Sequence, residues 1–298
     1  MTAGARKTPS APSTPPTPST PSTPSVPSMI VVKVGGEVLG GEQVKALAVD
    51  LAELRRRECR VVVVHGGGPQ ASELQQKLGL RPQQVAGRRV TDAATLDVMK
   101  MVVAGKLNVD LCAALVAAGL RPVGLHGASA LAIRAEKRPP RVVTGGPPEP
   151  VDLGHVGDVV GFATDLFDLL LVVGYVPVVA CLGADAGGAI YNINADIVAN
   201  QLAQTMRADH LFLVTSTPGV LRDLKDTSSR LPRLTARAAR LAIADGIVSG
   251  GMIPKLEEAL AVLDRGVGAI HILGKLSPGD LLKEADTPGS VGTVLTAE

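Results

Sequence analysis

Two glycine-rich segments, each at the end of a short apolar run, are the parts of this sequence best suited to bind anions. The run at 31–34 contains Lys33 and precedes a Gly-Gly pair at 35–36, and the run at 61–65 precedes three glycines at 66–68. Glycines after a strand let backbone N–H groups approach phosphate or carboxylate oxygens closely. A lysine within an apolar strand is costly unless it meets an anion. Together the segments predict a site for anionic ligands.

The two best-known nucleotide-binding motifs do not account for these glycines. Gly66, Gly68 and Ala71 fit the loose Gly-x-Gly-x-x-Ala dinucleotide pattern, but Asp92 follows a turn-like stretch where an acidic residue on a second strand is expected. The sequence contains no Gly-x-x-x-x-Gly-Lys-Ser/Thr pattern. On the glycines alone, a dinucleotide site and simple tight turns both stay open.

Strand-like and helix-like patterns alternate from Met29 onward and must position these segments. Continuous apolar runs occur at 30–34, 61–65, 121–125, 176–181, 211–215 and 269–273. Helical spacing of apolar residues occurs between them, at 44–54, 96–115, 197–206 and 256–263. Such alternation predicts an α/β fold, a three-layer αβα sandwich with a mostly parallel central sheet. Ligands bind such sheets beyond the carboxyl ends of the strands, where both glycine segments lie.

Composition excludes several classes of protein. The 298 residues have a hydrophobic content of 46%, which is enough for one large domain or two lobes. A formal net charge of +2, no Trp, two Tyr and three Phe argue against nucleic acid as the main partner. No apolar run reaches the roughly 18 residues that span a membrane. Three scattered cysteines (Cys59, Cys112 and Cys181) are typical of reduced thiols, so we expect a cytoplasmic protein.

Residues 1–28 differ from the rest of the chain. Pro, Ser and Thr make up 20 of these 28 residues. Such a segment buries too little apolar area to offset its ordering entropy, and it lacks the apolar core of a secretory signal. We expect a disordered tail without catalytic function. Because Met29 directly precedes the first strand, a second interpretation is that translation begins there.

Six short segments carry a resemblance to a known family. They are VKVGG at 32–36, HGGGP at 65–69, GRRVT at 87–91, GHVG at 154–157, NINAD at 192–196 and GGMIPK at 250–255. In this order and spacing they resemble the N-acetylglutamate kinases of the amino acid kinase family. The resemblance extends from about Met29 to the C-terminus.

This resemblance implies an amino acid kinase fold over 29–298. About 29–185 would form the acetylglutamate-binding and dimerisation lobe, and about 186–298 the ATP-binding lobe. The implied reaction transfers a phosphoryl group from ATP to the γ-carboxylate of N-acetyl-L-glutamate, giving N-acetyl-L-glutamyl 5-phosphate, an early step of arginine biosynthesis. ATP and Mg²⁺ are the implied cofactors. The phosphates would hold most of the Mg²⁺ coordination, since no carboxylate cluster in the sequence suits the metal by itself.

Roles follow from the resemblance, residue by residue. Lys33 and Lys255 correspond to the two lysines that stabilise the transition state, and Asp196 orients them. Arg89 would pair with the α-carboxylate in a bidentate geometry, whereas its neighbour Arg88 would be solvated. The implied substrate-binding residues are Gly67, Gly68, Arg89, Asn192 and Asn194. The implied ATP-binding residues are Gly35, Gly36, Thr215, Ser216, Gly219, Val220, Leu221 and Lys255. Asn and Asp are also common helix caps, so 192–196 has a structural reading as well.

Two stretches depart from the family pattern. The family usually has Thr-Asp-Val-Pro-Gly where this chain has Thr-Ser-Thr-Pro-Gly at 215–219. Loss of that carboxylate would weaken ATP contacts by roughly 1–3 kcal/mol if a buried charged hydrogen bond is lost. A Gly-x-Asp-Gly turn is replaced by Gly-Ala-Ser-Ala at 127–130. Because the lysines, Arg89, Asn192 and Asp196 remain, we interpret these changes as tuning of activity.

Assembly and regulation are predicted from the two ends of the chain. Arginine-inhibited relatives have an added N-terminal helix that links dimers into hexamers, which the proline-rich tail cannot form. Gly279 replaces the histidine expected near the C-terminus of such relatives, although Glu284 is kept. We therefore expect a homodimer with weak or absent arginine inhibition. The helical pattern from about Ala94 to Ala118 would provide the dimer surface or, equally simply, a buried core helix.

Two other functions stay open at this point. A sister kinase for another N-acylated acidic amino acid, such as N-succinylglutamate or a protected aminoadipate, would keep the same lysines. A weakly active regulatory homologue would bind nucleotide or amino acid without turnover, and the replaced residues at 128–130 and 216 are its support.

Overall fold

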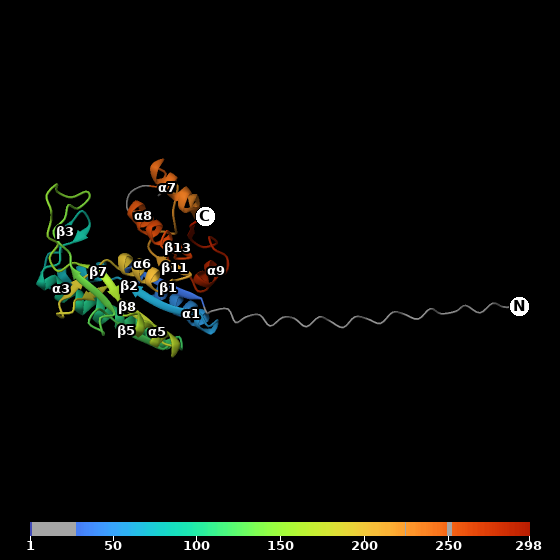
Figure 1. Ribbon diagram of the computed structural model, residues 1–298, viewed down its shortest axis with the longest axis horizontal. Helices are drawn as coiled ribbons and strands as arrows, with labels where there is room; N and C mark the ends of the chain where they lie inside the picture. Colours follow the sequence, from blue (N-terminus) through green and yellow to red (C-terminus); the bar gives the residue numbers. More distant parts are fainter. Residues whose placement is uncertain (2–27, 224, 249–251) are drawn as a thin grey trace.

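A mostly parallel eight-stranded sheet forms the centre of the protein (Figure 1). The computed structural model describes Met1 and residues 28–223, 225–248 and 252–298. The tail expected over 1–28 therefore lies outside the described residues except at its two ends, and so do Gly250 and Gly251 of the last family segment.

The strand order in this sheet is β12-β14-β13-β11-β1-β2-β8-β5. Every neighbouring pair is parallel except β13 and β14, which are antiparallel. All six strands predicted from apolar runs are confirmed, and they occupy the centre and one edge. The strands are β1 (Met29–Val34), β2 (Arg60–His65), β5 (Pro122–Leu125), β8 (Val176–Ala180), β11 (His210–Val214), β12 (Arg233–Thr235), β13 (Ala269–Leu273) and β14 (Thr293–Thr296).

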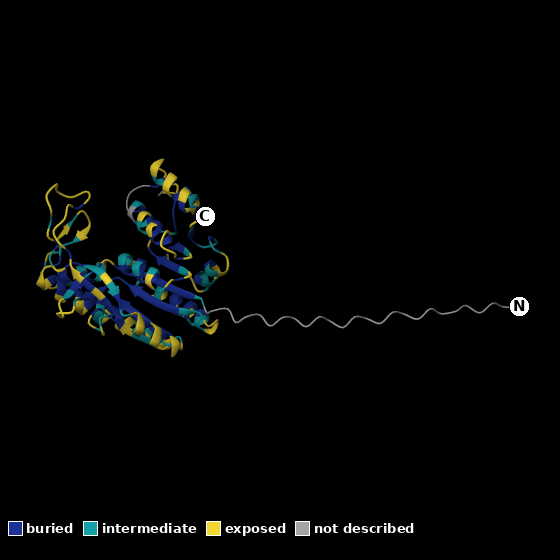
Figure 2. Cartoon of the chain, in the orientation of Figure 1, coloured by how far each residue is buried: buried dark blue, intermediate teal, exposed yellow. Residues whose placement is uncertain are grey.

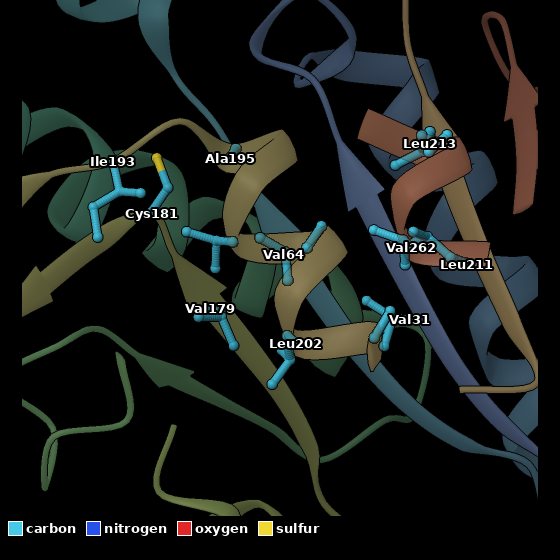
Figure 3. Packing of buried hydrophobic residues seen from close by; sticks show 14 of the residues in the cluster. Val31, Val64, Val179, Cys181, Ile193, Ala195, Leu202, Leu211, Leu213 and Val262 are labelled. Atoms are coloured by element: carbon cyan, nitrogen blue, oxygen red, sulfur yellow. The ribbon is translucent and has the colours of Figure 1, made fainter. Parts of the chain in front are cut away.

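Helices cover both faces of the sheet, so the predicted three-layer αβα sandwich is confirmed. Alternate residues of β1 point to opposite faces: Val31 joins one buried cluster, while Ile30 and Val32 join the other. Figure 2 shows the buried residues concentrated along the sheet, and Figure 3 shows the first cluster around β1, β2 and α6. Its helices include α2 (Gly68–Lys77), α5 (Thr164–Val172), α6 (Ala195–Thr205), α7 (Ala236–Ala244) and α8 (Met252–Leu263). The second cluster is covered by α1 (Gly41–Arg56), α4 (Asn108–Ala117) and α9 (Asp280–Asp286).

The long helical pattern predicted over about 94–118 is present but is not a regular α-helix. It begins as α3 (Ala93–Met99), whose cap Asp92 accepts a hydrogen bond from the Thr95 N–H at 2.8 Å. It continues as the π-helical segment η2 (Lys100–Leu107) and then as α4. A π-helical segment shifts the register of the buried face, which apolar spacing alone did not indicate. As a result, Val103 and Leu111 belong to different core clusters.

A second, four-stranded sheet and a short hairpin were not predicted from the sequence. The sheet has the order β10-β9-β6-β7, and β3 pairs with β4 in the hairpin. These strands are short, and several are polar, so they lack the continuous apolar runs of the central sheet. They are β3 (Gln84–Val85), β4 (Arg88–Arg89), β6 (Ile133–Lys137), β7 (Gly157–Phe162), β9 (Leu182–Ala184) and β10 (Ile190–Asn192). Two 3₁₀ turns, η1 (Gly36–Val38) and η3 (Thr227–Ser229), complete the elements.

A buried glutamate holds the turn before the last strand. The Glu284 carboxylate accepts hydrogen bonds from the N–H groups of Gly289, Val291 and Gly292 at 2.6, 2.8 and 3.0 Å. It also lies 3.0 Å from Nδ1 of His271. Burial opposes its ionisation, but these partners outweigh burial and lower the pKa of Glu284 to about 2.

Acid should therefore remove a measurable part of the stability of this protein through Glu284. Its folded pKa of about 2 lies below its ordinary value of 4.5. The contribution is thus complete above pH 4.5 and is lost as the pH falls toward 2; it amounts to about 3 kcal/mol. Urea unfolding at several pH values should show a steeper acid loss for the wild-type protein than for Glu284→Gln. Parallel curves for the two proteins would contradict this assignment.

Candidate active site

The two glycine segments meet at one cleft of about 360 Å³ at the carboxyl ends of β1 and β2. All five glycines, Gly35, Gly36, Gly66, Gly67 and Gly68, line it. The lining also includes side chains from β4, β10, the start of α6 and α8. The cleft therefore lies where a parallel sheet is expected to bind its ligands.

Close approach of the two turns explains why glycine is needed. A Cβ atom on Gly36 would lie 2.8 Å from Cδ of Pro69 and 3.2 Å from Cα of Gly67. A Cβ atom on Gly67 would lie 2.5 Å from Cδ1 of Leu107. Gln70 adds a side-chain link by donating from Nε2 to the Gly36 carbonyl at 2.7 Å. The two turns thus form one rigid wall of the cleft.

Hydrogen bonds fix the first turn beside the central sheet. The N–H of Gly35 donates to the carbonyl of Val214 at 3.0 Å, and the N–H of Gly66 donates to the carbonyl of Val34 at 3.1 Å. The Gly35 N–H is therefore engaged by the end of β11. A phosphate placed here would be met by N–H groups later in the turn, starting with that of Gly36.

Lys33, Asp196 and Lys255, far apart in sequence, gather at this cleft. Lys33 on β1 is only 6% exposed, and its Nζ lies 2.8 Å from Oδ1 of Asp196. Nζ of Lys255 on α8 lies 3.9 Å from Oδ2 of the same carboxylate and 3.5 Å from Oγ1 of Thr215. One carboxylate thus faces two ammonium groups. The net positive charge that results suits an anionic reacting group.

Asp196 stays ionised in this arrangement. Burial alone would raise its pKa, but Lys33 and Lys255 outweigh burial and hold the pKa below its ordinary value. Asp196 also lies in the first turn of α6, where the helix dipole favours a negative charge. An ionised Asp196 cannot give up a proton, so it suits an orienting role rather than acid catalysis.

Arg89 also lines the cleft and is held by α2. Its Nη1 donates to Oε1 of Gln75 at 2.5 Å, and its Nη2 donates to the Gly68 carbonyl at 2.9 Å and to Oγ of Ser72 at 2.7 Å. Three of its five N–H groups thus have neutral partners, while its charge has no counter-ion among them. Burial lowers the pKa of Arg89. A bidentate contact with a carboxylate would require Nη2 to release one of its partners.

The two asparagines of the 192–196 segment have structural partners as well as cleft positions. Oδ1 of Asn194 accepts the N–H of Asp196 at 2.9 Å and caps α6. Nδ2 of Asn192 donates to Oγ1 of Thr91 at 3.1 Å. Both asparagines line the cleft. A helix-capping role and a ligand-binding role for this segment are therefore compatible.

The residues expected on the ATP side follow the carboxyl end of β11. Their contacts with the Lys33, Asp196 and Lys255 group are limited. Thr215 contacts Lys255, as described above. Gly219, at φ +139°, leaves no room for a Cβ atom, which would lie 2.6 Å from Oγ1 of Thr293. Oγ1 of Thr293 also accepts the N–H of Val220 at 2.9 Å. The residues that line the cleft do not include Thr215, Ser216, Gly219, Val220, Leu221 or Lys255; Lys255 is connected to the cleft through its contact with Asp196.

A buried histidine supports the second glycine turn, a role that the sequence did not indicate. Nδ1 of His65 lies 3.0 Å from the Gly66 carbonyl, and its Nε2 lies 2.9 Å from Nδ2 of Asn108. Burial lowers the pKa of His65 to about 4. A neutral ring that donates from Nδ1 and accepts at Nε2 satisfies both contacts. His65 therefore positions the turn and carries no charge at pH 7.

Five further charged residues line the cleft and were not given a role there from the sequence: Glu37, Arg88, Arg138, Arg141 and Glu258. Arg138 is buried and pairs with Asp158 at 2.6 Å, whereas Arg141 is exposed. Arg88 is exposed, as expected, but also lines the cleft. Glu258 lies on α8, one turn after Lys255. No motif connects these positions in the sequence, because β4, the segment after β6 and α8 meet only in the fold.

The described part of the chain has neither a grouped set of metal ligands nor a helix that could span a membrane. Within 28–223, 225–248 and 252–298, no three His, Cys, Asp or Glu side chains are grouped so as to hold a metal ion. Over the same residues no helix has both the length and the apolar character needed to cross a bilayer.

Comparisons with known proteins agree with this architecture. Residues 28–274 match the model of the amino acid kinase family. An acetylglutamate kinase of Sorangium cellulosum is 62% identical over 266 residues, which cover 89% of this chain and 94% of that protein. An acetylglutamate kinase of Anaeromyxobacter dehalogenans strain 2CP-C is 60% identical, with 89% and 98% covered.

Solved structures share the fold at lower identity. An N-acetylglutamate synthase from Neisseria gonorrhoeae, in complex with coenzyme A and N-acetyl-glutamate, has a TM-score of 0.77 and 25% identity. The match covers 91% of this chain but only 60% of that synthase. A carbamate kinase from Giardia lamblia bound to AMP-PNP has a TM-score of 0.64 and 15% identity, with 92% and 100% covered. By sequence and by fold, this chain belongs to the amino acid kinase family and, within it, groups with the acetylglutamate kinases.

Proposed function

We propose that the chain transfers the γ-phosphoryl group of ATP to the γ-carboxylate of N-acetyl-L-glutamate, as a step of arginine biosynthesis. A carboxylate oxygen attacks the γ-phosphorus, the bond to the β,γ-bridging oxygen breaks, and ADP and N-acetyl-L-glutamyl 5-phosphate leave. The carboxylate is already ionised at pH 7, so the reaction needs no general base. Two anions must instead be brought together and held in line.

The arrangement of Lys33, Asp196 and Lys255 is the observation that carries this proposal. The two ammonium groups would contact oxygens of the transferring phosphoryl group, and Asp196 would orient them from between. A lysine that is 6% exposed beside an open cleft is preorganised, so little reorganisation is required when charge develops. As a compact point charge, lysine suits phosphoryl oxygens that change position during transfer.

The two ends of the cleft would hold the two substrates. Arg89, with an uncompensated charge, would bind the α-carboxylate of the acceptor, together with Asn192, Asn194 and the N–H groups of Gly67 and Gly68. The nucleotide would lie on the side of Gly35, Gly36 and Lys255, along the segment from Thr215 to Leu221. Mg²⁺ would be bound mainly by the phosphates, because the lysines already engage the oxygens of Asp196.

Turnover with a panel of acceptors tests the proposal. ADP release and hydroxamate formation would be measured with N-acetylglutamate, N-succinylglutamate, glutamate and aspartate. We expect N-acetylglutamate to give the highest kcat/KM. A preference for N-succinylglutamate would favour a sister kinase, and absence of turnover with all four would contradict the enzyme assignment.

Arg89→Lys should weaken acceptor binding more than it slows the chemical step. Lysine keeps the charge but cannot reproduce the planar fork, and it would also lose the contacts to α2. We expect KM for N-acetylglutamate to rise roughly ten- to hundred-fold, with KM for ATP little changed. Initial rates over both substrates would check this. An equal rise in both KM values would show that the substitution perturbs the cleft as a whole.

The proposal includes a cytoplasmic homodimer. Met101, Val109 and Val116 are 59%, 62% and 61% exposed and recur about every two turns along η2 and α4, so they form an apolar stripe suited to a second copy of the chain. Cys59, Cys112 and Cys181 are free thiols, as a reducing compartment favours. Light scattering would measure the assembly, and an arginine titration of the assay would measure inhibition. A hexamer or strong inhibition would contradict the expected homodimer with weak or absent arginine inhibition.

A further inference from the structure

Arg88 and Glu258 carry opposite charges and line the cleft from its two sides. Arg88 lies on β4 in the hairpin, and Glu258 lies on α8; Figure 1 shows the hairpin and α8 on opposite sides of the molecule's upper face. Within the part of the chain that the structure describes, the ion pairs at the cleft use only Asp196 and Asp158 as acids. Among the described residues, the charges of Arg88 and Glu258 are therefore not used in an ion pair at the cleft.

The surroundings of Glu258 make Arg88 its most effective cationic neighbour. Burial raises the pKa of Glu258, and the nearby Asp196 carboxylate raises it further. Three cations oppose this rise in pKa, with Arg88 first, ahead of Lys255 and Lys33. Lys33 is already held by Asp196 at 2.8 Å. Glu258 is thus a half-buried carboxylate that would gain by a direct cationic partner.

Arg88 also has a like charge near it, that of Arg141. Burial, the charge of Arg138 and the charge of Arg88 all lower the pKa of Arg141, while Asp158 raises it. Arg138 is neutralised by Asp158, but Arg141 is not paired among the described residues. Arg88 therefore has a like charge beside it and an unlike charge across the cleft.

We propose that Arg88 and Glu258 form an ion pair across the cleft when both substrates are bound, and act as positioning residues for phosphoryl transfer. Arg88 adjoins the acceptor residue Arg89, and Glu258 shares a helix with Lys255. A contact between them would hold the acceptor side against the nucleotide side. In-line transfer needs reacting atoms within about 3–3.5 Å, and the two bound anions repel each other, so a charge pair that bridges the two sides opposes that repulsion. The inference rests on the proposed kinase function.

Charge reversal tests the pair. Arg88→Glu and Glu258→Arg would be measured singly and together for kcat and kcat/KM with N-acetylglutamate and ATP. We expect each single reversal to lower both constants by about ten-fold or more, and the double reversal to recover to within about three-fold of wild type. Arg88→Glu combined with Glu257→Arg is the matched control. Glu257 is the exposed neighbour of Glu258 on α8, so this combination should give no recovery.

A binding readout separates positioning from a structural role. In the free protein Arg88 acts on Glu258 only at a distance, so any change in the Tm of the free protein should be small and alike in the single and double reversals. The Tm rise produced by N-acetylglutamate with a non-hydrolysable ATP analogue should be smaller in the single reversals and restored in the double. If the loss of kcat/KM in the double reversal equals the product of the losses in the two single reversals, the pair is overturned. A loss of Tm in the free single variants that the double reversal restores would overturn it as well. Wild-type protein without turnover would instead overturn the proposed function.

Discussion

Replacing Lys33 with alanine is expected to lower kcat by roughly 10²–10³-fold while leaving the fold intact. Lys33 is 6% exposed, and its ammonium group is held 2.8 Å from Asp196 at the cleft. That position provides a fixed positive charge where phosphoryl oxygens would lie. Because the charge acts mainly in the transition state, kcat should fall much more than KM rises.

The matched control is a lysine that also forms an ion pair but lies outside the cleft. Lys45 is exposed on α1 and pairs with Glu42 at 2.8 Å, so Lys45→Ala should keep wild-type kcat. Urea unfolding of both variants would show whether Lys33→Ala keeps the native state. A fall of less than about five-fold in kcat, with the fold retained, would mean that Lys33 does not contact the transferring group.

The central layer of the fold was predictable because burial dictates its sequence. Strands covered on both faces must be continuously apolar, as Val61–Val64 shows, and turns at their ends admit little but glycine. The four-stranded sheet escaped prediction for the opposite reason. A strand such as β6, Ile-Arg-Ala-Glu-Lys, has one polar face and too few residues to establish a period. The π-helical geometry of η2 depends on packing against neighbouring elements. The local sequence of η2 carries no signal for it.

The residues of the candidate site also fall into those that the sequence predicted and those that it did not. Lys33, Asp196 and Arg89 were identified through short motifs, and the structure brings all three to one cleft. Arg138 and Glu258 lie in no motif, and only the fold places them there. The neutral His65 was part of a motif, but its role depends on Asn108, which is 43 residues away. Sequence reasoning thus missed the residues that lie in no motif and those, such as His65, whose role depends on a partner outside any motif.

Asp196→Ala should reduce both activity and stability, which separates it from Lys33→Ala. Removal of this carboxylate leaves the buried Lys33 without its partner and beside a second ammonium group, that of Lys255. Loss of one member of a buried pair costs about 3–5 kcal/mol, the upper part of which requires full burial. Since the side chain of Asp196 is 19% exposed, we expect a loss near the lower end of that range. The lysines would also lose their orientation, so kcat should fall by roughly 10²-fold or more.

The same substitution at a surface pair provides the comparison for Asp196. Asp264 pairs with Arg240 at 2.6 Å, but both side chains are more than half exposed. Asp264→Ala should therefore change the free energy of unfolding by less than about 1 kcal/mol and leave kcat unaltered. If Asp196→Ala lost stability but kept kcat, the carboxylate would only neutralise Lys33. A loss of kcat in Asp196→Asn, which preserves the shape of the side chain, would show that the negative charge itself orients the two lysines.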